Sequence, residues 1–186
     1  MAEARFSCRC GALTGRLAGI DPREGTHVTC HCSDCARADR AFDGAGDRVQ
    51  GVALWQTTPD RVTIETGVEQ LRLTRLSPRG LNRWVAGCCG TPMFNTLKGP
   101  GMPFVGVLVA RLDSAAALGP VIAHGFVEGP DGKSRHKGGL AVGARIAKRA
   151  LRARLSGAWR ATPFFDPESG APVAEPEILP RDAGQG

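Results

Sequence analysis

The chain has 186 residues, of which 42% are apolar and 23% charged, a composition typical of globular proteins and not of disordered ones. Seven cysteines are too few for a disulfide scaffold, and no apolar run is long enough to span a membrane. The first residues show no apolar signal-peptide core, so we expect a cytoplasmic protein. The 25 glycines and 13 prolines favour short strands and turns, so we expect a mainly β fold.

The first third of the chain is predicted to contain strands and one short helix. Residues 6–17 indicate one or two strands, with Cys8 and Cys10 in the first. Residues 26–31 are β-branched and alternate in polarity, which predicts a strand. Ser33 or Asp34 can cap a helix over residues 35–40, and residues 41–51 have the composition of a loop.

The middle of the chain is typical of an antiparallel meander. Four runs alternate in polarity and are separated by turn residues. We expect strands over residues 52–57, 61–66, 70–76 and 83–86. A near-continuous apolar run over residues 104–112 predicts a buried strand.

The last part of the chain contains one clear helix pattern, over residues 140–156. Its apolar positions recur at steps of three and four; they are Leu140, Ala144, Ala147, Leu151 and Leu155. Five prolines follow Trp159, so residues 159–186 are expected to be an extended or disordered tail. We therefore expect one domain over residues 1–158.

The cysteines occur in three short segments, which favours metal or redox chemistry over disulfides. The first segment holds Cys8 and Cys10, the second Cys30, Cys32 and Cys35, and the third Cys88 and Cys89. Cysteines two apart on a strand present both sulfurs on one side, as one edge of a tetrahedral zinc site requires. A helix start at Cys35 would lower the pKa of its thiol.

Other interpretations of the cysteines stay open at this point. His27 and His31 have the spacing of a zinc-finger histidine pair and, together with Cys8 and Cys10, would mimic a zinc finger. Cys32 and Cys35 have the spacing of a redox dithiol, but the surrounding βαβ pattern is missing. The cysteines can also be unliganded core residues. A zinc ribbon is excluded because it needs two C-x2-C pairs.

Three motifs in order resemble the glutathione-dependent formaldehyde-activating enzyme family, also called centromere-protein-V-like. They are Cys8-Arg9-Cys10-Gly11-Ala12, then Cys30-His31-Cys32-Ser33-Asp34-Cys35, then Cys89-Gly90-Thr91. The resemblance covers residues 6–97 and implies a β-tent zinc fold. It implies that Cys8 and Cys10 join the late cysteines at a structural zinc. It also implies a second zinc on Cys30, Cys32 and Cys35, open to a thiol-bearing substrate.

This chain departs from the family's third motif, because Ala86 stands where that motif has its first cysteine. Cys88 lies beside Cys89 instead, and both reach one metal only if the chain turns there. Gly87 and Gly90 make such a turn feasible, so we expect Cys88 and Cys89 both to be ligands.

The resemblance implies a carbon–sulfur lyase that joins formaldehyde and glutathione reversibly, giving S-hydroxymethylglutathione, with one or two Zn²⁺ per chain. Three thiolates outweigh the charge of Zn²⁺, so a hydrolytic water is a poor fit and a small thiol such as glutathione is a better fourth ligand. Arg37, Arg40 and Arg48 are candidates to bind its carboxylates. No general acid or base can be assigned from the sequence.

A different function is indicated by residues 133–154, which hold eight Lys or Arg and no acid. Such a segment is typical of a face that contacts nucleic acid or an acidic partner. The alternative function is therefore a zinc-stabilised binding module that uses its basic helix.

Overall fold

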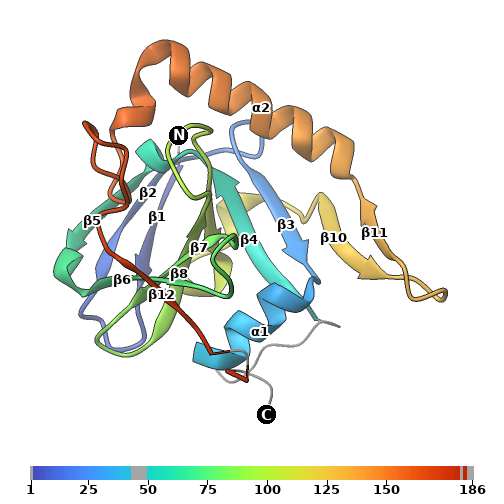
Figure 1. Ribbon diagram of the computed structural model, residues 1–186. Coiled ribbons are helices and arrows are strands. Elements are labelled where there is room, and N and C mark those ends of the chain that lie inside the picture. Colours follow the sequence, from blue (N-terminus) through green and yellow to red (C-terminus); the bar gives the residue numbers. More distant parts are fainter. Residues whose placement is uncertain (1, 43–49, 181, 184–186) are drawn as a thin grey trace.

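A computed structural model describes residues 2–42, 50–180 and 182–183 of the chain (Figure 1). Within these residues the fold is mainly β, as predicted. The strands are β1 (Ala2–Ser7), β2 (Thr14–Ile20), β3 (Thr26–Cys30), β4 (Val52–Thr57), β5 (Val62–Thr66), β6 (Leu71–Arg75), β7 (Asn82–Ala86), β8 (Thr91–Thr96), β9 (Val105–Leu108), β10 (Ala123–Glu128), β11 (Ser134–Lys137) and β12 (Pro176–Ile178). The α-helices are α1 (Ser33–Phe42) and α2 (Gly139–Ser156).

The strands form two sheets. The smaller has the order β1-β2-β5 and the larger the order β11-β10-β3-β4-β9-β8-β7-β6-β12. Neighbouring strands are antiparallel except for the β10–β3 and β12–β6 pairs. Figure 1 shows α2 across the end at which β3 begins, and α1 at the end at which β3 finishes.

The hydrophobic core joins the two sheets. Phe6 of β1 packs edge-on against Phe94 of β8, with ring centroids 5.1 Å apart. Trp55 and Trp84 come from the larger sheet, and both are almost fully buried. Because side chains alternate along a strand, the other face of the larger sheet is free to carry α1 and a cleft.

The four strands of the predicted meander exist, and β6 pairs antiparallel with β7 as predicted, but the expected pairing of β5 with β4 and β6 is wrong. β5 pairs with β2 in the smaller sheet, whereas β6 pairs with β7 and β12 in the larger one. Single 3-10 turns at Pro59–Arg61 and Val68–Gln70 redirect the chain, the second after Gly67 in the left-handed region. β8 was not predicted, because it is buried along its whole length and so lacks alternation.

Helix α2 forms where expected, but the face predicted to pack is exposed. Leu140 is 95% exposed and Leu155 80%, while the buried side holds Arg149, Ala150 and Ala153. Small alanine side chains let the helix lie close to the sheet, and the leucines face away from it. The 3.6-residue period of the apolar positions therefore predicted the helix correctly, but it predicted the wrong face to be packed against the sheet.

The proline-rich segment after residue 158 was expected to be extended or disordered, but over the residues described it contains a 3-10 turn at Ala158–Arg160 and a chain reversal bridged between Phe165 and Pro172, and it packs on the domain. Phe164 and Phe165 are buried in the main core, and Trp84 contacts both rings. β12 adds a parallel edge strand beside β6. No helix in the described ranges has the length and apolarity needed to cross a membrane.

Candidate metal centres and the adjoining cleft

The first two cysteines lie in the turn between β1 and β2, not in a strand as predicted. The Cys8 N–H donates to the Leu13 carbonyl at 2.9 Å, and the Gly11 N–H donates to the Cys8 carbonyl at 3.0 Å. Gly11 has a φ of +77°, a conformation that favours glycine. The turn brings the Sγ atoms of Cys8 and Cys10 to 3.6 Å from each other.

A second turn, between β7 and β8, faces the first. The N–H groups of Cys89 and Gly90 both donate to the Ala86 carbonyl. Gly90 has a φ of +67°, so the chain reverses directly after the cysteine pair. The expected turn is present, and the Sγ atoms of Cys88 and Cys89 lie 3.8 Å apart in the same group.

The four sulfurs of these two turns have the separations that a tetrahedral metal requires. Cys88 Sγ lies 3.8 Å from Cys8 Sγ and 3.4 Å from Cys10 Sγ. A Zn–S distance near 2.3 Å places tetrahedral sulfurs about 3.8 Å apart. All seven cysteines are free thiols. Cys8, Cys10, Cys88 and Cys89 can therefore hold a metal ion.

Neighbouring polar groups stabilise the ionised sulfurs of Cys8 and Cys89 in this four-cysteine group. The Leu13 N–H donates to Cys8 Sγ at 3.2 Å, and Thr91 Oγ1 lies 3.0 Å from Cys89 Sγ. Partial burial opposes ionisation of Cys89, but hydrogen bonds from Thr91 and the backbone of Cys10 outweigh it and lower its pKa to about 6. Such contacts orient ligands and favour their metal-binding form.

The second group holds Cys30, Cys32 and Cys35, at the junction of β3 and α1. Cys30 ends the strand and Cys35 lies in the first turn of the helix, which begins at Ser33, two residues earlier than predicted. The Sγ atoms of Cys30 and Cys32 are 3.4 Å apart, and the Cys35 N–H donates to Cys32 Sγ at 3.3 Å. The three sulfurs all lie within 4.8 Å of one another, so this group can also hold a metal ion.

Without a metal, this three-cysteine group favours one thiolate and two thiols. Hydrogen bonds from the thiols of Cys30 and Cys35 lower the pKa of Cys32 to about 2. The same sharing raises the pKa of Cys30 and Cys35. A metal that binds here must therefore displace protons from Cys30 and Cys35.

A cleft of about 650 Å³ adjoins the three-cysteine group, between the start of α1 and the first half of α2. Its volume is within the range of small-molecule sites. The cysteines lie in one wall, and apolar side chains from β3, β4, β10 and α2 line much of the remainder: Val28, Leu54, Ala123, Val142 and Ile146.

Arg37 and Arg40, two of the three arginines predicted to bind substrate carboxylates, are not among the residues that line this cleft. Arg37 donates to the carbonyls of Pro180 and Ala183, so it holds the C-terminal segment. Arg40 also lies on α1, away from the lining. Arg48 lies outside the described residues.

A row of polar residues crosses the floor of the cleft at one register. Gln56 of β4 pairs with Gly106 of β9, Gly106 with Asn95 of β8, and Asn95 with Arg83 of β7. Arg83 is buried, and its Nη1 donates to Asn95 Oδ1 at 3.4 Å. This row was not predicted from the sequence. Arg83, a charged residue next to Trp84 in a predicted strand, is the signal that could have indicated it.

The histidines do not join the cysteines as in a zinc finger. His27 Nδ1 hydrogen-bonds the Gly119 carbonyl at 2.9 Å. His31 Nε2 lies 3.1 Å from Nδ1 of His124, and the two rings stack. His124 and His136 both line the cleft, and neither was singled out from the sequence.

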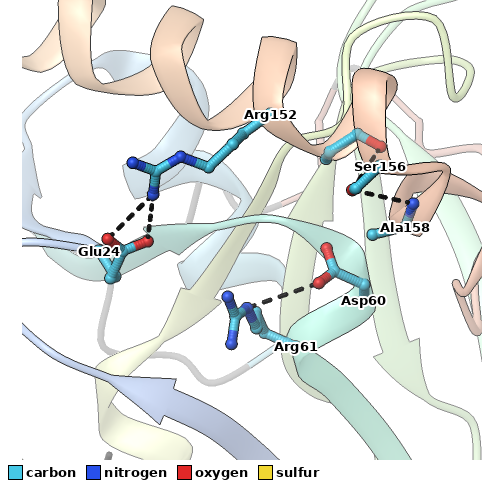
Figure 2. A network of polar contacts seen from close by, with 7 residues as sticks. Glu24, Asp60, Arg61, Arg152, Ser156 and Ala158 are labelled. Carbon is cyan, nitrogen blue, oxygen red and sulfur yellow. Dashed lines mark hydrogen bonds and ion pairs between the residues drawn. The ribbon is translucent and has the colours of Figure 1, made fainter.

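All four arginines of the basic helix α2 contact the chain itself. Arg152 bonds both carboxylate oxygens of Glu24 at 3.1 Å, as Figure 2 shows. Arg145 donates to the Pro22 carbonyl, Arg154 to the Gly101 carbonyl, and the buried Arg149 to Thr26 Oγ1. These contacts attach α2 to β3 and to the loops that hold Pro22, Glu24 and Gly101.

The fold and site define a mainly β protein with two candidate metal centres, one of them beside a cleft. The chain belongs to DUF6151, a family of unknown function whose model matches residues 3–177. A crystal structure of a Rhodobacter sphaeroides protein, a structural genomics target, is similar at 21% identity and a TM-score of 0.46. The similarity covers 63% of this chain and 96% of that one. A search of curated proteins finds no match.

Proposed function

We propose that the chain is a zinc protein with two centres. Cys8, Cys10, Cys88 and Cys89 hold a structural zinc, since four thiolates fill a tetrahedral site. Cys30, Cys32 and Cys35 hold the second, with one position left for an external ligand. The sulfur separations and the preference of soft thiolates for zinc support this assignment.

The second centre binds a small thiol, such as glutathione, in the adjoining cleft. One observation carries this proposal: three clustered thiols line a cleft of about 650 Å³ that is large enough for such a ligand. Zinc, when bound, supplies a soft site that favours the ligand's sulfur as a thiolate. Catalysis of the carbon–sulfur lyase type is supported by the resemblance to the formaldehyde-activating family.

In that reaction the thiol sulfur forms a bond to the carbon of formaldehyde, and the carbonyl π bond breaks. The thiol proton ends on the new hydroxyl group, so the reaction needs no oxidant or other reactant. His124 is the candidate to move this proton, because it lines the cleft and its Nδ1 is held by His31. Its Nε2 is then the nitrogen available to the substrate.

The test is calorimetric titration of the zinc-loaded protein with glutathione, followed by an assay for S-hydroxymethylglutathione formation. We expect saturable binding that Cys32→Ser abolishes, while Arg37→Gln serves as a control outside the cleft. Binding without turnover would leave a thiol-binding zinc protein and refute the lyase. No binding at millimolar glutathione would refute the thiol site.

A further inference from the structure

Arg83 is a buried cation with no carboxylate partner among the residues that the structure describes, although its charge also acts on the nearby sulfurs of Cys32 and Cys35. Arg83 is only 6% exposed. Within the described part of the chain, the single polar contact of its side chain is a hydrogen bond of 3.4 Å from Nη1 to the neutral amide oxygen of Asn95. A buried guanidinium normally pairs with a carboxylate or another anion, because its desolvation is otherwise uncompensated. The nearby sulfurs supply negative charge, and a carboxylate of a ligand would add a direct hydrogen-bonding partner for the guanidinium.

The surroundings of Arg83 leave room for such a group. In the polar row, Asn95 stands between Arg83 and Gly106. A Cβ added at Gly106 would meet no atom closer than 3.8 Å, so the space above this glycine is unfilled. Gln56 continues the row and uses its Oε1 to accept from Thr26, so its amide nitrogen remains for a ligand. The row therefore offers a ligand the guanidinium of Arg83 and the amide groups of Asn95 and Gln56, with unfilled space above Gly106.

The same cleft places the three-cysteine group beside Arg83. Cys35 and Arg83 share the lining of the cleft and also that of a smaller recess beneath α1. Apolar residues of β4 and α2, including Leu54, Val142 and Ile146, also line the cleft. A ligand that spans these features has a sulfur at one end, an anionic group near it and an apolar frame.

We propose that Arg83 and Asn95 form an anion-binding subsite of the cleft, and that the natural ligand is a thiol bearing a carboxylate on a short, largely apolar frame. This rests on the proposed thiol site, whose sulfur-binding group is the three cysteines. Arg83 binds the carboxylate through its planar fork, and Asn95 fixes the orientation of that fork. The carboxylate-binding role that was predicted for Arg37, Arg40 and Arg48 is thus assigned to Arg83 of β7.

A competing role for Arg83 is to balance the negative charge of the thiolates themselves. That role would affect every thiol ligand alike, whether or not it carries an acid. An anion-binding subsite affects only the acid. The two roles therefore differ in a measurable preference between two thiols of the same size.

The experiment compares 3-mercaptopropionate with its neutral isostere 3-mercaptopropionamide, by calorimetric titration of the zinc-loaded protein. We expect the acid to bind about ten-fold more tightly or better. Arg83→Gln should remove this preference and leave the affinity for the amide within about two-fold, whereas Arg37→Gln should keep the preference. Arg83→Lys, which keeps the charge without the fork, should retain part of it.

Each outcome decides a different point. Equal binding of acid and amide by the natural protein would overturn the subsite while leaving the thiol site intact, and this comparison needs no variant to fold. An equal loss of both ligands in a folded Arg83→Gln protein would assign Arg83 to charge balance and also overturn the subsite. Binding of neither thiol would refute the proposed function and the subsite with it.

Discussion

The Sγ atoms of Cys8 and Cys88 lie 3.8 Å apart, although 80 positions separate them in the sequence. A metal at this point joins the β1–β2 turn of the smaller sheet to the β7–β8 turn of the larger one. With a metal bound there, the two sheets would be connected by ligand bonds at the rim of the core as well as by packing within it.

Removal of the metal should loosen the connection between the sheets. Structural zinc contributes about 10–16 kcal/mol in small domains, against a whole-domain stability of about 5–15 kcal/mol. We expect a strong chelator to lower the melting temperature by at least about 10 °C. Differential scanning calorimetry checks this, with Cys8→Ser as the control that should melt low with or without chelator. A melting temperature of the natural protein that chelation leaves unchanged would contradict it.

Thr91 should set the pH at which the four-cysteine group releases its metal. The pKa of Cys89 is lowered to about 6, so its thiolate persists above that pH and is lost as pH falls through it. Thr91→Val removes a hydroxyl 3.0 Å from Cys89 Sγ, which raises this pKa toward its ordinary value. We expect release at higher pH and metal affinity about 10–100-fold weaker, measured with a zinc-sensitive dye. Coincident release curves for the two proteins would show that Thr91 has no such role.

His124 should affect turnover without affecting thiol binding. General acid–base groups contribute about 100-fold to 10,000-fold to a rate. His124→Gln should therefore lower the rate of S-hydroxymethylglutathione formation by at least about 100-fold while the dissociation constant of glutathione stays the same. The matched control is His27→Gln, because His27 bonds the Gly119 carbonyl and does not line the cleft. An equal effect of both variants would argue against proton transfer by His124.

The segment after α2 should contribute to stability. Phe164 is fully buried and contacts both Trp84 and Phe94. Phe164→Ala should lower the free energy of unfolding by about 3–5 kcal/mol in urea denaturation. Leu155→Gln, at an exposed position of α2, should change it by less than about 0.5 kcal/mol. The reverse ranking would contradict the packing described for both segments.

Local patterns predicted most strands well, because alternation is visible in a strand with one solvated face. β4 has the predicted bounds, β5 and β7 differ by one residue at one end, and β6 is one residue shorter at each end. Pairing was not predictable in the same way, since it depends on turns that send β5 to a different sheet from β4 and β6. The packed face of α2 was also missed, because alanines and an arginine, not leucines, face the sheet.

The candidate metal groups were predictable because clustered cysteines are a strong signal at short spacing. Both groups contain the residues expected from the sequence, including the adjacent Cys88 and Cys89. The reason given for Cys8 and Cys10 was incomplete, since a turn and not a strand brings them together. Arg83 and His124 were missed because they reach the cleft from β7 and β10, far from the cysteines of β3 and α1 in the sequence.

The most direct measurement is the zinc content per chain of protein purified without added metal, by inductively coupled plasma mass spectrometry. We expect two zinc ions per chain in the natural protein. The double variant Cys30→Ser and Cys32→Ser should retain one. A natural protein that contains no zinc, and that takes up none when zinc is supplied, would contradict the two metal centres on which the proposed function depends.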